Sequence, residues 1–547
     1  MCGICGIYNY SDKQAVKKMA KKISHRGPDS NGFYVDEKIS LGFRRLSIID
    51  LKSGNQPIFN EDKNACIIFN GEIYNYKELR KFLEKKKHRF YTNSDTETII
   101  HSYEEFGEKC VNYLEGMFAF AIWDMNKKQL FIARDRVGIK PLYYTINQER
   151  VIFASEIKAI FQIEDVPRKI DIQSLNEMSI FGHTIGNSTM FKDIKELKPG
   201  HLMTINSKGI KIKKYWDIKS NPKIISEKNT LIKVKKLFTQ SVKEQMVSDV
   251  PLGVFLSGGI DSSILTATTN KMFQGDLKTF SIADSEYNED LMNARMVAQS
   301  LNTNHHEFIV DPEQVIKEIP KYIYHLESPD YKFIFWYLVA KKASKYVKTG
   351  FSGEGADEQF CGYPMYKDVL NHKSYLEKRY KITNPQNFRR EEYFRNLIYE
   401  LTKKNGIYSL INYGLKSQLN HLQLTPVDHS TMGASIEVRV PYLNTRFLEF
   451  TSTIPINMKI KGIEKYILRK SFRDSGLPTK IIQRKKLFGG RATFQNSFKL
   501  LENISRNQKI NNSYKNIFKN RKSSMFIYDI FEKTFIENNC KICKNIL

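Results

Sequence analysis

The chain has 547 residues, of which 41% are hydrophobic and 12% aromatic, and its formal net charge at pH 7 is +27. This composition excludes global disorder, and at roughly 100–200 residues per domain the length predicts two to four domains. No stretch approaches the roughly 18 apolar residues of a membrane span, and the N-terminal stretch up to Gly27 has no long apolar signal segment. We therefore expect a cytoplasmic protein without a membrane partner.

The positive charge raises the alternative of a nucleic-acid partner. Lysines are spread along the whole chain, and the densest basic run, at residues 84–89, follows a helical pattern. No signature of an RNA-binding module accompanies them. We therefore expect no nucleic-acid partner.

Cysteine usage points to a reduced protein. Cys2 with Cys5 and Cys540 with Cys543 form two CxxC pairs, which is a spacing that zinc sites use. The pairs lie at opposite ends of the chain, and Cys5 falls in a predicted strand. We expect neither a zinc site nor a disulfide framework.

The chain opens with MCGICGIYNY, in which a cysteine follows the initiator methionine directly and leads into a strand-like run. An N-terminus is normally a frayed end. Cys2 is therefore either an accident of sequence or a residue that uses its own terminal amine.

The first 215 residues are predicted to be mainly strands, with two or three helices. Short runs rich in Ile, Phe and Tyr and bounded by Asn, Gly and Asp predict the strands, and helical spacing predicts the helices. A polar, breaker-containing stretch at residues 216–229 marks the predicted domain boundary. The predicted strands cover residues 66–75, 117–124, 129–136 and 151–157, and the predicted helices cover residues 77–86 and 96–107.

Beyond the boundary, helices and strands alternate, which predicts a parallel α/β sheet. The last 150 residues favour a mostly helical end. The predicted helices cover residues 231–247 and 263–273, and the predicted strands cover residues 251–257 and 277–283.

Two loops of small residues follow predicted strands. SGGIDSS, at residues 257–263, lacks the lysine of a Walker loop but suits a pyrophosphate, with a helix beginning near Ser262. SGEGADE, at residues 352–358, repeats the chemistry with acids at Glu354, Asp357 and Glu358. The alternative reading is two glycine turns whose acids cap helices. Loops after two strands of one parallel sheet meet at its carboxyl edge, where Asp261 and Asp357 would share a cation.

These motifs resemble the glutamine-hydrolysing asparagine synthetase family. The resemblance covers almost the whole chain and rests on MCGICGI, SGGIDSS and SGEGADE together with SHRGPDSNG, NGEIYNYKELR, ARDRVGIKPLYY, EVRVPYLN and EKYILRKSF, in this order. It implies an N-terminal glutaminase at residues 1–215, with two stacked antiparallel sheets between helices, a linker at residues 216–229, and an ATP-pyrophosphatase synthetase domain at residues 230–547.

The resemblance implies a role for the unusual N-terminus. Removal of Met1 would expose Cys2, whose thiol attacks the amide of glutamine while its own α-amine acts as the base. A free α-amine and a thiol have similar pKa values, so the proton passes between them at little cost. Asn70 and Gly71 are implied to form the oxyanion hole.

Other positions are implied to bind glutamine. Arg45 would clamp its carboxylate, and Glu72, Asn70 and Asp95 would complete the site. Asp95 also has a structural reading, because SDTE is a capping box from Ser94 to Glu97, and both readings can hold.

The synthetase half is implied to use ATP and Mg²⁺. Lys465 would neutralise charge during adenylation, and Glu354 would take a proton from ammonia that arrives through an internal tunnel. Leu256 and Ile282 are assigned to adenosine; Ser257, Gly258, Gly259, Asp261, Ser262 and Ser263 to pyrophosphate; Ser352 and Gly353 to AMP; and Asp261 and Asp357 to the metal.

The carboxylate that receives the ammonia is expected to be aspartate, and the alternative is another carboxylate such as a uronic acid of a surface polysaccharide. Two other readings are less favoured: the N-terminal Cys2 argues against a tRNA- or nucleotide-modifying enzyme, and the filled catalytic positions argue against a regulatory homologue without activity. A homodimer is also left open. Three stretches depart from the family pattern, namely VPYLN with Asn444, the segment around Phe488, and TPVDHSTMG at residues 425–433, where acceptor choice would be made.

Overall fold

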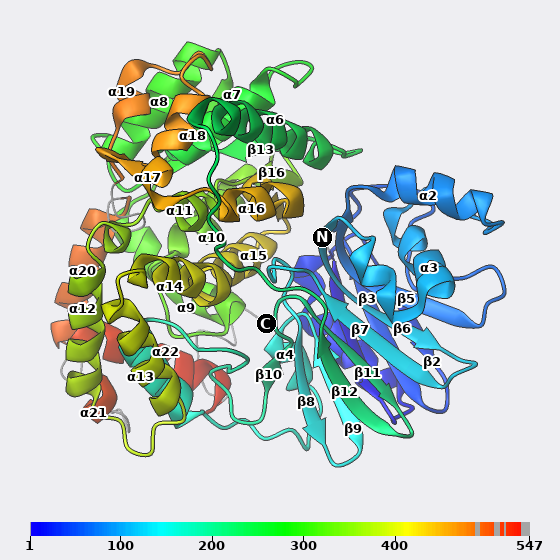
Figure 1. Cartoon of the computed structure of the whole chain (residues 1–547). Coiled ribbons are helices and arrows are strands. Elements are labelled where there is room, and N and C mark those ends of the chain that lie inside the picture. Colours follow the sequence, from blue (N-terminus) through cyan, green and yellow to red (C-terminus); the bar gives the residue numbers. More distant parts are fainter. Residues whose placement is uncertain (1, 487–492, 508–514, 519–520, 538–547) are drawn as a thin grey trace.

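The computed structural model describes residues 2–486, 493–507, 515–518 and 521–537. Two antiparallel sheets form one side of the molecule and a parallel sheet surrounded by helices forms the other (Figure 1). None of the helices in these ranges combines the length and apolar character that a bilayer crossing requires. The predicted architecture, two stacked antiparallel sheets followed by a parallel sheet with a largely helical end, is confirmed.

Each of the two antiparallel sheets has six strands, and β1 lies inside the first while β5 lies inside the second. In spatial order the first sheet contains β10 (Lys195–Glu196), β8 (Tyr143–Asn147), β9 (Arg150–Ala154), β1 (Gly3–Tyr8), β3 (Ile39–Arg45) and β2 (Ser30–Val35). The second contains β12 (Gly209–Lys214), β11 (His201–Asn206), β7 (Gln129–Arg134), β6 (Gly116–Asp124), β5 (Ala65–Ile73) and β4 (Ile58–Phe59).

Alternation along the strands explains why the sheets stack. Ile4 points between the two sheets, whereas Cys5 points to the opposite face, which α1 covers. Ile68 likewise points between the sheets, whereas Ile67 faces α3. Successive side chains of a strand alternate between faces, so strands buried on both faces read as continuous apolar runs.

The structure has more helices in this region than the two or three predicted. Within residues 2–215 there are five α-helices: α1 (Lys13–Lys22), α2 (Tyr76–Lys85), α3 (Asp95–Phe106), α4 (Ile157–Ile160) and α5 (Ile172–Phe181). The lysine-rich α1 begins at an Asp12 cap, whose carboxylate accepts from two backbone N–H groups, and it buries Val16, Met19 and Ala20. The sequence did not predict this helix, because its few apolar residues are interspersed with lysines.

The parallel sheet has the order β15 (Asn304–Ile309), β14 (Lys278–Ala283), β13 (Leu252–Phe255), β16 (Thr349–Phe351) and β17 (Glu437–Arg439). A small two-stranded hairpin, β18 (Ile460–Lys461) and β19 (Ile463–Glu464), follows later. The earlier helices around the sheet are α6 (Glu227–Gln245), α7 (Ile260–Asn270), α8 (Glu289–Leu301), α9 (Pro312–Leu326), α10 (Ile334–Ala343) and α11 (Ala356–Phe360).

The remaining chain is mostly helical in the described residues, as predicted. The helices are α12 (Val369–Thr383), α13 (Glu391–Thr402), α14 (Gly406–Tyr413), the π-helix η4 (Gly414–Leu424), α15 (Thr425–Met432), α16 (Thr445–Ser452), α17 (Ile456–Lys459), α18 (Tyr466–Ser471), α19 (Thr479–Gln483), α20 (Gln495–Asn507), α21 (Lys515–Phe518) and α22 (Lys522–Phe535).

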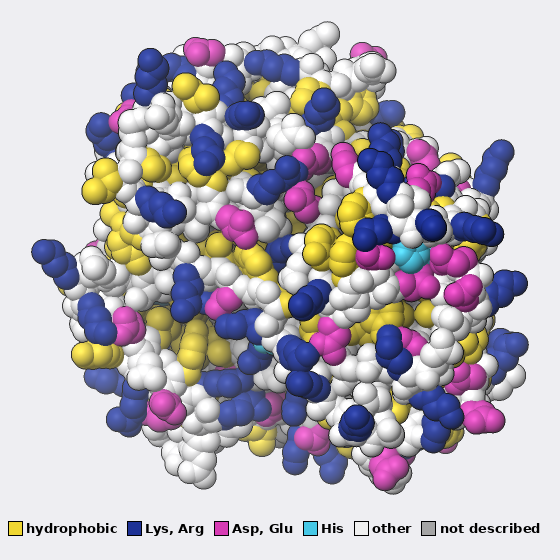
Figure 2. Space-filling model, turned by 45° about the vertical axis from the view of Figure 1, so that its right-hand side comes forward, with side chains coloured by type: hydrophobic (Ala, Val, Ile, Leu, Met, Phe, Trp, Pro, Cys, Tyr) yellow, Lys and Arg dark blue, Asp and Glu magenta, His cyan; other side chains and the backbone are white. Residues whose placement is uncertain are grey.

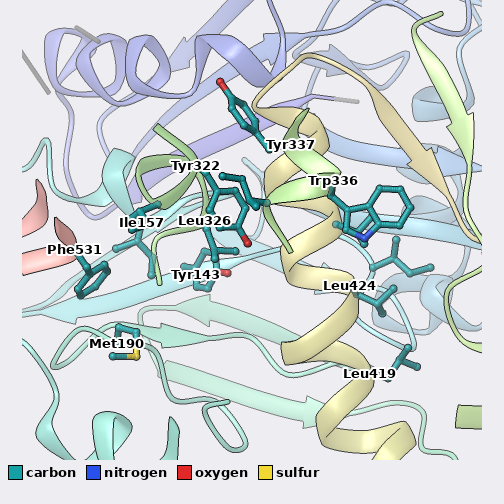
Figure 3. Packing of buried hydrophobic residues seen from close by; sticks show 14 of the residues in the cluster. Tyr143, Ile157, Met190, Tyr322, Leu326, Trp336, Tyr337, Leu419, Leu424 and Phe531 are labelled. Atoms are coloured by element: carbon teal, nitrogen blue, oxygen red, sulfur yellow. The ribbon is translucent and has the colours of Figure 1, made fainter. Parts of the chain in front are cut away.

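The two sides of the molecule share one apolar core. Tyr143, Ile157 and Met190 lie in the same cluster as Leu326 of α9 and Phe531 of α22 (Figure 3). Burial of this shared surface holds the antiparallel and parallel sheets against each other, at roughly 25 cal/mol for each Å² removed from water.

Candidate active sites

Cys2 lies directly before β1 and is 8% exposed. Its backbone N–H donates to Asn70 Oδ1 at 3.1 Å, and its Sγ lies 4.0 Å from the carbonyl oxygen of Leu46. Burial raises the pKa of the Cys2 thiol to about 11, although the positive charge of Arg45 opposes the rise. The sulfur is therefore a thiol at neutral pH, and a base would have to remove its proton before it could act as a nucleophile.

Asn70 and Gly71 are consecutive residues of β5, and Asn70 contacts Cys2. Because Asn70 Oδ1 accepts from the Cys2 N–H, its Nδ2 is left as a donor, and that buried atom has no hydrogen-bond partner among the described residues. A Cβ on Gly71 would lie 2.0 Å from the Met117 carbonyl oxygen, so only glycine fits there. A free amide donor on a residue that contacts Cys2 suits a developing oxyanion.

Glu72 and Asp95 supply two buried carboxylates to the same region. Glu72 Oε2 has no hydrogen-bond partner in the described residues, and Asp95 Oδ2 accepts from the Ile73 N–H at 2.9 Å. Burial and the nearby Glu437 raise the pKa of Glu72 well above its usual value, and burial raises the pKa of Asp95 to about 6. A cationic ligand such as an α-ammonium group would relieve this crowding of negative charge.

The expected capping box at the start of α3 forms only in part. Ser94 Oγ accepts from the Thr96 N–H at 3.2 Å, as an N-cap does. The Glu97 carboxylate accepts instead from the N–H groups of Tyr91 and Thr92, at 2.8 and 2.7 Å, and so misses Ser94. The loop before Ser94 folds back over the end of the helix, and its backbone N–H groups bind the Glu97 carboxylate.

Arg45 is the last residue of β3, and its guanidinium is hydrogen-bonded to the loop that follows. Its guanidinium donates to the carbonyl oxygens of Asp50 and Ile49, at 2.5 and 3.3 Å, and to Asn55 Oδ1 at 3.2 Å. Gly54 lies against this guanidinium, because a Cβ there would be 2.6 Å from Arg45 Nη2. An anion that binds Arg45 must therefore replace some of these backbone contacts.

The first small-residue loop joins β13 to α7, which begins at Ile260, two residues before the predicted start. Gly258 has a φ of +68°, and a Cβ there would lie 2.5 Å from the Ala294 backbone nitrogen of α8. Ser262 Oγ accepts from the Ser257 N–H at 3.2 Å and donates to the Gly259 carbonyl at 3.1 Å. Seven of the predicted ATP-binding residues lie here: Leu256, Ser257, Gly258, Gly259, Asp261, Ser262 and Ser263.

The second loop follows β16 and touches the first, as predicted. A Cβ on Gly353 would lie 3.2 Å from Asp261 Cβ, and the Ser352 N–H donates to the Arg439 carbonyl at 3.0 Å. Leu256 and Ile282 are buried at the carboxyl ends of the neighbouring strands β13 and β14. The carboxyl edge of a parallel sheet is where such folds bind ligands.

Two carboxylates and two lysines meet where the loops touch. Lys465 Nζ contacts Asp261 Oδ2 and lies 2.5 Å from Asp357 Oδ1, while Lys486 Nζ lies 2.7 Å from Asp357 Oδ2. Burial opposes ionisation of Asp357, but the two lysines outweigh it and lower its pKa to about 2. Asp261 Oδ1 is buried without a hydrogen-bond partner among the described residues. Two carboxylates with a free oxygen form a donor set that fits Mg²⁺.

Glu354 lies beside this cluster and titrates differently. Burial and repulsion from Glu358 raise its pKa to about 8, and the neighbouring Lys486 opposes that rise. Glu358 is held by the Tyr363 hydroxyl, which donates to its Oε1 at 2.9 Å. Burial also raises the pKa of Glu358, to about 7, so the pKa values of both acids suit a proton acceptor working near neutral pH, and the Tyr363 contact occupies Glu358.

Sequence reasoning missed two buried arginines that join the two regions. Arg26 Nε donates to the Cys2 carbonyl at 3.2 Å, and its Nη2 donates to Asp428 Oδ2 at 2.8 Å. Arg439 Nη2 lies 3.6 Å from Glu72 Oε1. Both arginines lie in the motifs SHRG and EVRVP, but a buried arginine and an exposed one look alike in a single sequence.

Lys486 and Gly362 were missed as well. The basic run at residues 484–486 was the only signal for Lys486. A Cβ on Gly362 would lie 1.9 Å from Asp357 Oδ1 and 2.1 Å from Lys465 Cε, so glycine leaves the space in which Lys465 and Asp357 meet.

Two of the noted departures have structural explanations. Asn444 caps α16, because its Oδ1 accepts from the Arg446 N–H at 3.1 Å, which an aspartate would also do. In α15, Asp428 pairs with Arg26, and His429 lies 3.2 Å from the Tyr143 hydroxyl, so TPVDHSTMG forms contacts between the two sides of the molecule. Phe488, Cys540 and Cys543 lie outside the described residues.

An N-terminal cysteine beside a free amide donor, joined to two small-residue loops on a parallel sheet, defines an ATP-dependent ligase that hydrolyses glutamine. Residues 1–216 match the family described as "Glutamine amidotransferase domain", and residues 233–535 match the family described as "Asparagine synthase". The chain belongs to the glutamine-hydrolysing asparagine synthetase family, as its motifs indicated.

Curated relatives agree over almost the full length. The chain is 36% identical to asparagine synthetase [glutamine-hydrolyzing] 1 of Bacillus subtilis, over 89% of this chain and 86% of the relative. It is 32% identical to the enzyme numbered 3 of the same organism, with the same coverage. It is 31% identical to the Zea mays enzyme, over 89% of this chain and 77% of that protein.

Proposed function

We propose that this chain makes asparagine from aspartate, with ammonia taken from glutamine and energy taken from ATP. In the proposal, residues 1–215 release ammonia, residues 230–547 activate the acceptor, and residues 216–229 link them. The observation that carries the proposal is that one chain holds Cys2 against a free amide donor and, linked to it through Arg439, an Asp–Lys cluster between two small-residue loops. We expect the protein to work in the cytoplasm, which supplies ATP and keeps thiols reduced.

In the glutaminase step, loss of Met1 would place an α-amine where the Cys2 N–H now donates to Asn70 Oδ1. That amine would accept the thiol proton, and Cys2 Sγ would attack the glutamine amide carbon. Asn70 Nδ2 and the Gly71 N–H would stabilise the oxyanion, while Glu72 and Asp95 would hold the α-ammonium and Arg45 the carboxylate. A thioester forms and ammonia leaves, after which water releases glutamate.

In the synthetase step, the acceptor carboxylate would attack the α-phosphorus of ATP, giving an acyl-adenylate and pyrophosphate. Asp261 and Asp357 would hold Mg²⁺, which when bound would neutralise phosphate charge. Lys465 and Lys486 would turn from these carboxylates towards phosphate oxygens. Ammonia would then displace AMP, with Glu354 accepting the proton.

Ammonia would travel inside the protein. Most free ammonia is protonated at neutral pH and is then no nucleophile, so a closed route preserves it. Arg439 contacts both proposed sites, because its side chain lies 3.6 Å from Glu72 and its carbonyl accepts from the Ser352 N–H. We place the route beside this arginine.

The deciding test supplies glutamine, ATP, Mg²⁺ and aspartate and measures asparagine, glutamate, AMP and pyrophosphate. We expect all four in equal amounts, and we expect Cys2→Ala to make asparagine only from ammonium salts. ATP and glutamine turnover that aspartate does not stimulate would instead direct the search to another carboxylate, such as a uronic acid. Retained glutaminase activity in Cys2→Ala would contradict the nucleophile assignment.

A further inference from the structure

A compact group of histidines and carboxylates lies outside both candidate active sites. It joins the turn between β4 and β5, the chain after α2, and the middle of α3. His101 Nδ1 lies 2.8 Å from Glu104 Oε2 and 2.9 Å from Glu61 Oε2, and His88 Nδ1 lies 3.2 Å from Glu61 Oε1. One ligand atom from each of these four residues falls within 4.8 Å of the other three.

Buried contacts orient the side chains of this group. His101 is fully buried, and Glu61 Oε2 is a buried atom whose polar neighbour is His101 Nδ1. Asn60 Nδ2 donates to Glu104 Oε1 at 2.6 Å, which leaves Oε2 turned to the histidines. Such outer contacts orient metal-binding carboxylates in many proteins.

The sequence places the four ligands on stiff supports. His101 and Glu104 are three residues apart on one face of α3, Glu61 follows strand β4, and His88 follows α2. Figure 2 shows a histidine among acidic side chains on the face that carries these elements. We propose that Glu61, His88, His101 and Glu104 bind a divalent transition-metal ion of the zinc type.

The ligand chemistry selects this class of ion. Two imidazole nitrogens and two carboxylate oxygens suit zinc and its neighbours, whereas Mg²⁺ and Ca²⁺ prefer oxygen alone. Without an ion, the Nδ1 atom of each imidazole lies within hydrogen-bond distance of a carboxylate oxygen. Bonds of about 2.0–2.2 Å to zinc place tetrahedral ligand atoms about 3.3 Å apart, so the four atoms must shift only slightly to admit the ion.

Two more carboxylates face the histidines. Glu97 Oε1 lies 3.6 Å from His101 Nε2, and Glu105 Oε2 lies 3.7 Å from His88 Nε2. They contact the imidazole nitrogens that the proposed ion does not use, so they would hold each ring with Nδ1 free as a ligand. The ion would then connect the chain after α2, helix α3 and the edge of the sheet. Helix α3 also carries Asp95.

The test uses the full chain with Cys540→Ser and Cys543→Ser, in excess Mg²⁺ so that oxygen-only sites are filled. Co²⁺ is titrated while its visible absorption is recorded, and Zn²⁺ is then added in competition. We expect one Co²⁺ per chain with the intense absorption of a tetrahedral site, displacement by Zn²⁺, and a melting temperature that Zn²⁺ raises. No thiolate-to-metal absorption should appear, because the ligands are nitrogen and oxygen.

Variants locate the ion. We expect His88→Gln and Glu104→Gln each to weaken Co²⁺ binding by about 10- to 100-fold. The matched control Glu84→Gln removes a carboxylate of α2 that pairs with Arg80 outside this group, and it should leave the affinity within about threefold. Absence of the tetrahedral spectrum in the folded, glutamine-hydrolysing protein would overturn the proposal. Binding that survives both ligand variants would overturn it too.

Discussion

At the scale of single residues, the proposed glutamine site brings buried carboxylates together, which raises their pKa values. Burial raises the pKa of Asp95 to about 6, and the pKa of the neighbouring Glu72 also lies above its usual value. An α-ammonium ligand binds the ionised forms, so protonation competes with binding. We expect the KM for glutamine to rise as the pH falls through about 6. The rate of adenylation, which does not use glutamine, should change less.

The measurement is the KM for glutamine in initial-rate glutaminase assays across this pH range. Asp95→Asn removes one titrating group, and we expect it to weaken binding at all pH values and to flatten the profile. A KM that stays level between about pH 5 and pH 8 would show that these carboxylates do not hold the ammonium group.

Glu354 is the residue whose chemistry should separate activation from amide formation. We expect Glu354→Gln to slow asparagine formation by about 100-fold or more, because a general base acts mainly on the transition state. Exchange of labelled pyrophosphate into ATP, which reports adenylation, should persist. Glu358→Gln is the comparison, since Tyr363 already holds that carboxylate. A larger loss in Glu358→Gln than in Glu354→Gln would move the base to the other acid.

At the scale of elements, the loop between β13 and α7 is fitted to α8. Gly258 adopts a φ of +68°, and any Cβ would collide with the backbone of Ala294. We expect Gly258→Ala to raise the KM for ATP by about 10- to 100-fold, because small displacements of a binding loop are costly. Glutamine hydrolysis by the other side of the molecule should persist.

The control separates collision from backbone strain. Gly275 also has a positive φ, +92°, but a Cβ there meets nothing within 4 Å. We expect Gly275→Ala to cost about 1 kcal/mol of stability and to leave the KM for ATP unchanged. Equal effects of the two variants would mean that contact with α8 does not shape the loop.

The helices, strands and loops also show which parts of the structure a single sequence predicts. The predicted strand at residues 66–75 and helix at residues 96–107 are confirmed as β5 and α3, because both combine long apolar patterns with clear end signals. Helix α1 was missed, since its three buried residues are scattered among lysines. The two loops were found from their small residues and acids, whereas Lys486 and Arg439 belong to the sites only through distant contacts that no local pattern encodes.

At the scale of the whole molecule, charged groups cross the contact between the two sides. Arg26 lies fully buried between the Cys2 carbonyl, Glu156 and Asp428, and Lys140 Nζ lies 3.7 Å from the other oxygen of Asp428. Asp428 belongs to α15, in the synthetase half, so it is connected to Cys2, the proposed nucleophile, through one arginine. Isolated buried ion pairs are weak evidence for stability, but removing one partner leaves the other unpaired and costly.

Asp428→Asn tests whether this contact couples ammonia release to its use. The amide has nearly the same shape but no charge, so Arg26 keeps Glu156 and the Cys2 carbonyl while losing one counter-ion. We expect excess glutamate over asparagine in glutamine-driven assays, unchanged synthesis from ammonium salts, and a free energy of unfolding lower by about 3 kcal/mol. Glu313→Gln, which removes an exposed pair with Lys317, should change neither the ratio nor the stability. A stoichiometry of one glutamate per asparagine in Asp428→Asn would show that Asp428 supports the fold without positioning Cys2 for coupled turnover, since the stability loss alone does not alter that ratio.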